Sequence, residues 1–156
     1  MKDYPRYPLI LSNEYHIIEF TSIGVKGEIA KVINFQPTEN PLVYNLAFGD
    51  KINSSGSNDL EFDDSVNSDN GDRDIVLATI ASAVFAFTQK NPDKWIYFAG
   101  VNDVRTRLYR MAITKNYSEL CRDFHIFGVD FIDDTFVRVP FESSINFIGF
   151  IIKRKT

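Results

Sequence analysis

The chain has 156 residues, of which 44% are hydrophobic and 24% are charged, and this composition is typical of a folded globular domain rather than a disordered chain. The net charge of −4 argues against tight non-specific binding of nucleic acid by the whole molecule, although it leaves room for a local basic patch. The apolar runs are too short for a membrane-spanning helix, which needs about 18 consecutive apolar residues.

The cysteine content and the N-terminus indicate the compartment. Cys121 is the single cysteine, so the chain cannot form an internal disulfide, as a secreted domain of this size commonly does. The apolar run at 9–11 is soon followed by Asn13 and Glu14, which makes it too short for a secretion signal. We therefore expect a cytoplasmic protein that is neither exported nor embedded in a membrane.

The first 50 residues predict three strands, at 15–21, 28–35 and 42–48. In the third, large apolar side chains occupy every second position, which is the period that places one set of side chains on a core face. Gly24 and Gly27 stand where a turn would join the first two strands. The simplest arrangement of these segments is an antiparallel β-meander.

Residues 50–74 form an acidic region, in which eight carboxylates outnumber two basic side chains and give a local charge of −6. We predict a solvated loop with one short strand near 60–62. The calcium-binding EF-hand pattern is excluded, because placing Gly71 at its glycine position would put Val66 at the first ligand position. A cation site of another kind stays open as an alternative; its ligands would be Asp63, Asp64, Asp69 and Asp72.

A helix is predicted over 75–89, where apolar residues recur at helical spacing and acidic residues precede the first turn. Asn91 and Pro92 end it. The next segment, 95–99, is apolar on both faces and too short for a stable helix, so it predicts a central buried strand. A second helix should begin after Asn102 as N-cap and run to about Lys115.

The remaining chain predicts a shorter helix at 117–124, a strand at 125–132, a link through Pro140 and a last strand at 145–152, followed by a solvated basic tail. The fold class is α+β, with an N-terminal antiparallel β-meander and two main helices packed on one curved mixed sheet. We expect residues 1–156 to form a single domain, with the acidic loop at about 50–74.

Several well-marked chemistries are missing from the sequence. His16, His125 and Cys121 do not have the spacing of a zinc site, and the phosphate-binding loops GxxxxGK[ST] and GxGxxG are absent. We therefore expect no metal and no cofactor. Cys121 and His125 are four residues apart, so nucleophilic catalysis stays an alternative to a simple structural role for both.

The strongest candidate for a binding site is the segment that follows the buried strand at 95–99. It contains Arg105, Arg107, Tyr109 and Arg110 within about one and a half helical turns. Arginine presents a rigid, permanently charged fork that matches phosphate and carboxylate groups, and a helix N-terminus supplies backbone donors to the same ligands.

Helical geometry assigns the two sides of this segment. At 100° per residue, Val104, Leu108 and Met111 should face the core, while Arg107 and Arg110 lie on the opposite side. The alternative role is structural: Arg107 could pair with Asp103 one turn earlier, and the acidic loop could neutralise the other arginines.

Three segments resemble a family of small, uncharacterised single-domain proteins found mainly in Bacteroidetes. They are YNLAFGD at 44–50, NGDRDIVLATIASAVFAF at 70–87 and RTRLYRM at 105–111. The resemblance covers nearly the whole chain and implies a bacterial protein. Because the family has no established activity, the resemblance implies a shared fold and no catalytic residues.

The leading functional hypothesis is a non-enzymatic binding or regulatory module. Its candidate contact residues are Arg105, Arg107, Arg110 and Tyr109, and its partner would be an anionic ligand, RNA or an acidic protein. A second hypothesis is a small RNA-acting enzyme of the kind found in toxin systems, with Tyr109 or His125 transferring a proton. A third is a structural protein that forms homo-oligomers through an exposed edge strand.

Overall fold

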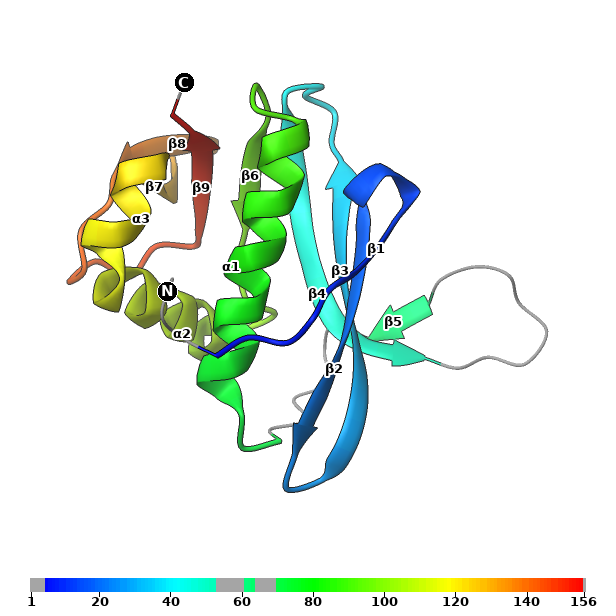
Figure 1. The fold of residues 1–156 in the computed structure, drawn as a ribbon. Coiled ribbons are helices and arrows are strands. Elements are labelled where there is room, and N and C mark those ends of the chain that lie inside the picture. The colour runs from blue at the N-terminus through cyan, green and yellow to red at the C-terminus, as the bar shows by residue number, and fades with distance from the viewer. Residues whose placement is uncertain (1–4, 53–60, 64–69, 156) are drawn as a thin grey trace. The chain divides into compact units, whose positions relative to one another are not determined.

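The computed structural model describes residues 5–52, 61–63 and 70–155, and its α+β architecture confirms the predicted fold class (Figure 1). The elements in chain order are β1 (Ile10–Ser12), the 3-10 helix η1 (Asn13–Tyr15), β2 (Ile17–Gly24), β3 (Gly27–Pro37), β4 (Val43–Ile52), β5 (Glu61–Asp63), α1 (Arg73–Lys90), β6 (Trp95–Phe98), α2 (Asp103–Lys115), α3 (Tyr117–Asp123), β7 (Phe124–Ile132), β8 (Thr135–Pro140) and β9 (Gly149–Arg154).

The chain forms two compact units. The α1 unit consists of 2–36 and 47–90, and the α2–α3 unit contains 37–46 and 91–156. The strand β4 begins in the α2–α3 unit and ends in the α1 unit. No helix in the described ranges has the length and apolar character needed to cross a membrane.

In the α1 unit, β2 and β3 pair antiparallel and correspond to the first two strands of the predicted meander, while β1 adds a further antiparallel strand to β2. The β2–β3 hairpin closes where Gly24 pairs with Gly27, which adopts a φ of 91° that favours glycine. The short strand β1 was missing from the sequence prediction, because a three-residue segment with exposed side chains carries no alternating pattern.

The core of the α1 unit is built where α1 meets aromatic side chains of the strands. The ring of Phe87 is fully buried and stacks on Phe35 of β3, with the ring centroids 4.2 Å apart. The ring of His16 lies edge-on to Phe87 at 5.4 Å. His16 therefore contributes to aromatic packing, in keeping with a structural role.

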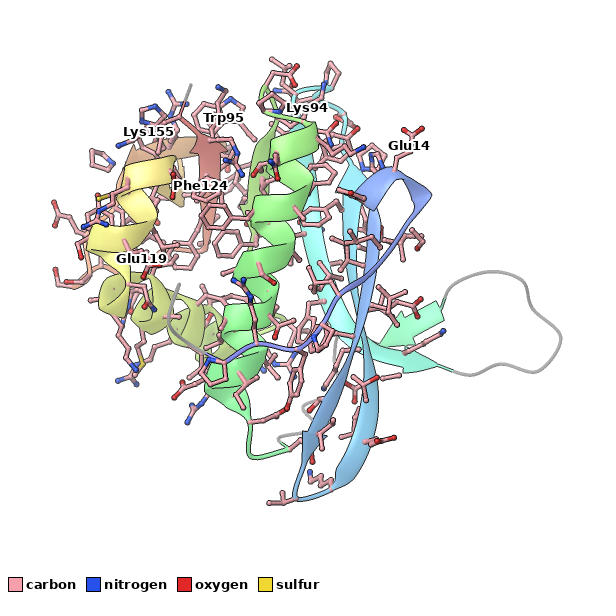
Figure 2. All side chains as sticks on the ribbon, in the orientation of Figure 1. Glu14, Lys94, Trp95, Glu119, Phe124 and Lys155 are labelled. Atoms are coloured by element: carbon pink, nitrogen blue, oxygen red, sulfur yellow. The ribbon has the colours of Figure 1, made fainter. Side chains whose placement is uncertain are left out.

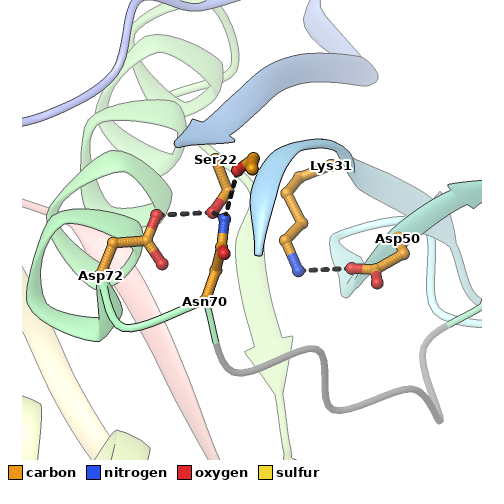
Figure 3. A network of polar contacts seen from close by, with 6 residues as sticks. Ser22, Lys31, Asp50, Asn70 and Asp72 are labelled. Atoms are coloured by element: carbon orange, nitrogen blue, oxygen red, sulfur yellow. Dashed lines mark hydrogen bonds and ion pairs between the residues drawn. The ribbon is translucent and has the colours of Figure 1, made fainter. Parts of the chain in front are cut away.

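A buried polar cluster links the β2–β3 hairpin to the start of α1 (Figure 3). The side-chain amide of Asn70 donates to Ser22 Oγ at 3.1 Å and to the carbonyl of Gly27 at 2.9 Å, and its oxygen accepts from the Lys26 amide at 2.6 Å. The Asp72 carboxylate accepts hydrogen bonds from the hydroxyls of Ser22 and Tyr7, both at 2.5 Å.

Two of these residues, Asn70 and Asp72, flank Gly71 in one short loop before α1. Gly71 has a φ of 78°, and the Asp72 carbonyl accepts the first helical hydrogen bond from the Val76 amide at 3.0 Å. A Cβ added to Gly24 would lie 1.9 Å from the Asn70 carbonyl oxygen, so the hairpin and this loop approach closely. The loop thus fixes where α1 begins relative to the β2–β3 turn.

The phenol of Tyr7 gives this cluster a pH dependence. Burial and the hydrogen bond to Asp72 raise the pKa of Tyr7 above its usual value. The protonated phenol therefore stabilises the folded state. This stabilisation is complete below the unfolded-state pKa of about 10, and it is lost as the pH rises through the raised folded-state pKa. We expect Tyr7→Phe to reduce the loss of stability at alkaline pH, as measured by urea unfolding at pH 8 and at pH 11. An unchanged pH profile would contradict this assignment.

Two of the acidic residues of 50–74, Asp50 and Asp72, have partners. Asp50 forms an ion pair with Lys31, which is buried (Figure 3), and Asp72 is held as described above. Most of the predicted acidic loop, including Asp64 and Asp69 of the alternative cation site, lies outside the described residues.

In the α2–α3 unit the strand order is β4-β6-β9-β7-β8. The strand β6 runs parallel to β4 and antiparallel to β9, so the sheet is mixed, as predicted. The helices α2 and α3 lie on one face of this sheet (Figure 1), and their contacts include the edge-to-face pair of Phe98 and Tyr109 at 5.6 Å.

Two predictions for the C-terminal segment are wrong. The link through Pro140 is instead the strand β8, an edge strand whose last residue is this proline, a position that needs no amide donor. The last strand covers 149–154 rather than 145–152, because Lys153 pairs with Trp95 and Arg154 lies 5.6 Å from the Phe124 ring centroid. The side chains of this strand and of the neighbouring β6 and β7 are shown in Figure 2, where Trp95 and Phe124 are labelled.

Candidate functional site

The helix α2 begins after a tight junction with β6. Asn102 is the N-cap, as predicted, since its side-chain oxygen accepts a hydrogen bond from the Arg105 amide at 2.9 Å. The Gly100 amide donates to the hydroxyl of Thr106 at 3.0 Å. A Cβ on Gly100 would lie 2.4 Å from the Thr106 amide nitrogen, so this position requires a glycine for the close approach of strand and helix.

The predicted orientation of α2 is wrong. Val104 is 69% exposed and Met111 is 53% exposed, whereas Thr106 and Ile113 are buried. The prediction assigns the most apolar residues to the core face, but a threonine can also be buried when its hydroxyl is hydrogen-bonded. The Thr106 hydroxyl donates to the Asn102 carbonyl and accepts from the Gly100 amide.

Two of the candidate arginines, Arg107 and Arg110, lie beside a cavity of about 680 Å³. The cavity lies between the first half of α2 and the segment that leads into β9. Its apolar side chains are Val104, Phe147, Ile148 and Phe150, and its polar side chains are Asp103, Thr106, Arg107, Arg110, Ser144 and Asn146. This size falls within the range of small-molecule sites, which is about 300–1,000 Å³.

Two buried rings contribute to the wall of this cavity. Phe147 and Phe150 are 5% and 0% exposed, and their ring centroids are 6.1 Å apart. A Cβ added to Gly128 would lie 2.4 Å from the Phe147 ring, so the absence of a side chain there makes room for it. These rings form a packed layer behind the cavity, whose accessible apolar surface comes from Val104 and Ile148, which are 69% and 41% exposed.

Arg110 and Arg107 differ in how they are held. Arg110 donates to the carbonyl of Ile145 at 3.0 Å and to the side-chain oxygen of Asn146, which fixes its guanidinium against the segment before β9. Arg107 is exposed and forms neither an ion pair nor a hydrogen bond within the described part of the chain, although Asp103 is one turn away. The i,i+4 pair that would give Arg107 a structural role is thus not formed.

The other two candidates lie elsewhere on α2. Arg105 is not among the residues that line the cavity, and neither is Tyr109. The ring of Tyr109 packs edge-on against Phe98, on the sheet side of the helix. Burial raises the pKa of the Tyr109 phenol, while the nearby charge of Arg105 lowers it to a smaller extent. A raised pKa keeps the phenol protonated at neutral pH, which disfavours a role as a general base.

Part of the cavity could not be foreseen from sequence. Asn146 and Phe147 come from the segment 145–152 that the hydrophobic pattern assigns to the last strand, so the prediction places their side chains in a buried sheet. The nearest signal in the sequence is the polar group Glu142–Ser144 after Pro140, which is typical of a loop.

Metal binding has no candidate within the described ranges, where no group of three or more His, Cys, Asp and Glu side chains is placed to hold an ion. Cys121 is half-buried on α3 and its thiol lies 3.5 Å from the Ser118 carbonyl, whereas His125 is exposed on β7. No hydrogen bond between these two side chains is present in the described structure.

Comparison with known proteins places the chain in a family. A model described as a family of unknown function, DUF6934, matches residues 3–155. The chain belongs to this family. No curated protein and no solved structure matches it. Because the family carries no described activity, the function has to be argued from the geometry of the molecule.

Proposed function

We propose that this member of the DUF6934 family is a non-enzymatic binding module, and that its cavity beside α2 holds a small molecule with a phosphate or carboxylate group. The observation that carries the proposal is that Arg107 and Arg110 line one cavity of about 680 Å³, with Arg107 free of protein partners among the described residues. Arginine forks bind such anions through two parallel hydrogen bonds.

The remaining lining defines the rest of the ligand. Val104 and Ile148 are exposed and offer apolar surface to the body of the ligand, and Asn146 and Ser144 offer hydrogen-bonding groups at its edge. Since Asp103 is the one carboxylate in the lining, the two arginines leave the site with a net positive charge. The ligand should therefore be an anion attached to an apolar body, rather than a bare inorganic ion.

Arg107→Ala is expected to weaken ligand binding while leaving the fold intact, because its exposed side chain makes no ion pair or hydrogen bond in the described structure. The test is a thermal-shift screen of nucleotides, aromatic carboxylates, phosphate and sulfate, followed by titration calorimetry of any compound that stabilises the wild type. Loss of one charged hydrogen bond should weaken binding about tenfold or more.

Arg122→Ala is the matched control, since it removes an equally exposed arginine of the same unit that does not line the cavity. The proposal fails if no anion stabilises the wild type, or if both variants weaken binding equally. Arg110→Ala is less informative, because it also removes the two hydrogen bonds that hold the segment before β9.

A further inference from the structure

The sheet of the α2–α3 unit has a second face, opposite to the one on which α2 packs. Directly paired residues of neighbouring strands lie on the same face, and successive residues alternate. Phe98 contacts Tyr109 of α2 and therefore lies on the helix-covered face. Trp95 is three residues earlier in the same strand, so Trp95 and its cross-strand partner Lys153 lie on the opposite face. We call its following members the aromatic platform: Trp95, His125, Phe127, Phe131, Phe136, Arg138, Ile151 and Lys153.

Aromatic rings of the platform are open to solvent. Phe136 of the edge strand β8 is 67% exposed and Phe131 of β7 is 52% exposed. Their ring centroids are 4.9 Å apart across the β7–β8 ladder. Large exposed rings that gather on one sheet face commonly mark an interaction surface.

Arg138 occupies the centre of the platform. Its guanidinium carbon lies 4.7 Å from the ring centroids of both Trp95 and Phe127. The rings hold the guanidinium through cation–π contacts, and no carboxylate within the described residues forms an ion pair with it. Its N–H groups are therefore oriented by the rings and available to an anion.

The charge on the platform has one sign. Lys153 and His125 are cross-strand neighbours, which adds a cation and a titratable imidazole to Arg138. Asp130 is the single carboxylate within β6, β7, β8 and β9, and it pairs with Val137 on the opposite face. The nearest other carboxylates along the chain stand outside these strands, at Asp93 before β6, at Asp123 before β7, at Asp133 and Asp134 in the β7–β8 turn and at Glu142 after β8.

We infer that the aromatic platform binds single-stranded RNA. Unpaired bases stack on exposed rings such as Phe131 and Phe136, while phosphates contact Arg138 and Lys153. A duplex is disfavoured because its base faces are already stacked. The exposed imidazole of His125 beside the cations offers a hydrogen-bonding group to the 2′-hydroxyl, which DNA lacks. The four strands β6–β9 contain one carboxylate, Asp130, which lies on the opposite face, so the platform itself is basic although the chain has a net charge of −4.

Trp95 makes the inference directly testable, because it is the single tryptophan of the chain and lies on the platform. Titration of the full-length protein with a U12 RNA should quench its fluorescence, and anisotropy of a labelled U12 should give the affinity. The affinity should fall with salt, with a slope of log K against log salt of about −1.4 to −2.1 for two or three phosphate contacts. Parallel titrations with dT12 and with an RNA duplex should show weaker binding.

Phe136→Ala and Arg138→Gln should each weaken U12 binding about tenfold. Circular dichroism should show that Phe136→Ala is folded, since the ring it removes is mostly exposed. The charge-matched control Arg122→Gln, on α3 and away from the platform, should bind like the wild type.

Four results would overturn the inference: no binding of U12, equal binding of U12 and dT12, unchanged affinity of Phe136→Ala, or equal weakening by Arg122→Gln. A concentration-dependent dimer that Phe136→Ala abolishes would assign the platform to self-association instead. Arg107→Ala should leave U12 binding unchanged, so this test is independent of the one for the cavity.

Discussion

Replacing Phe87 with alanine is expected to lower the free energy of unfolding by about 3–5 kcal/mol, the usual cost of removing a fully buried ring. Phe87 is 0% exposed, stacks on Phe35 at 4.2 Å and meets the edge of His16 at 5.4 Å. Its removal leaves a cavity that α1 cannot easily close, since the helix is anchored at its start by the Asp72 cluster. Domains are stable by about 5–15 kcal/mol, so the variant should be only marginally folded.

Urea unfolding followed by circular dichroism measures the effect. Phe136→Ala serves as the control, because it removes the same ring from an exposed position and should change the stability by less than about 1 kcal/mol. Phe87→Leu should cost less than Phe87→Ala, since leucine refills part of the space. If Phe87→Ala and Phe136→Ala cost the same, the proposed core of the α1 unit is wrong.

The second large effect is expected at Asn70, where alanine should cost about 2–4 kcal/mol. The substitution removes both donors to Ser22 Oγ and the Gly27 carbonyl, and it leaves the Lys26 amide without its acceptor. Asn70 is 3% exposed and Ser22 is 0% exposed, so water does not easily replace these hydrogen bonds.

Asn40→Ala is a suitable control, because it removes an exposed side-chain acceptor of the Leu42 amide and should cost less than about 1 kcal/mol. Amide hydrogen exchange adds a local measurement. Protection of the Val25 and Lys26 amides, which bond to Asn70, should fall in Asn70→Ala before protection in α1 does. If amide protection fell equally across the whole α1 unit, Asn70 would not act locally on the β2–β3 turn.

The strong periodic signals of the sequence predicted the fold well. The helix expected at 75–89 is α1, Asn102 caps α2, and the apolar run that begins at Trp95 is the central strand β6. These elements depend on local patterns and on caps, which a single sequence records directly. The errors lie where long-range pairing decides, as for β8 and the boundaries of β9.

The candidate site was predictable only in part. The arginine-rich segment was correctly assigned to a helix, and Arg107 and Arg110 lie beside one cavity. The rotation of α2 was not predictable from apolar residues, because Thr106 is buried through hydrogen bonds that depend on Gly100 and Asn102. The cavity wall opposite α2, formed by residues of 144–150, and the aromatic platform both depend on strand register. This register pairs residues as distant in the sequence as Trp95 and Lys153.

The two units alternate along the sequence, and this limits how recombination can divide the gene. Each unit contains two separate stretches of sequence, and the single strand β4 contributes to both. No continuous segment of the gene therefore encodes one unit alone. Recombination at a single junction would split at least one of the two units, so they should pass between genomes as one block, and the family model that spans residues 3–155 accords with this.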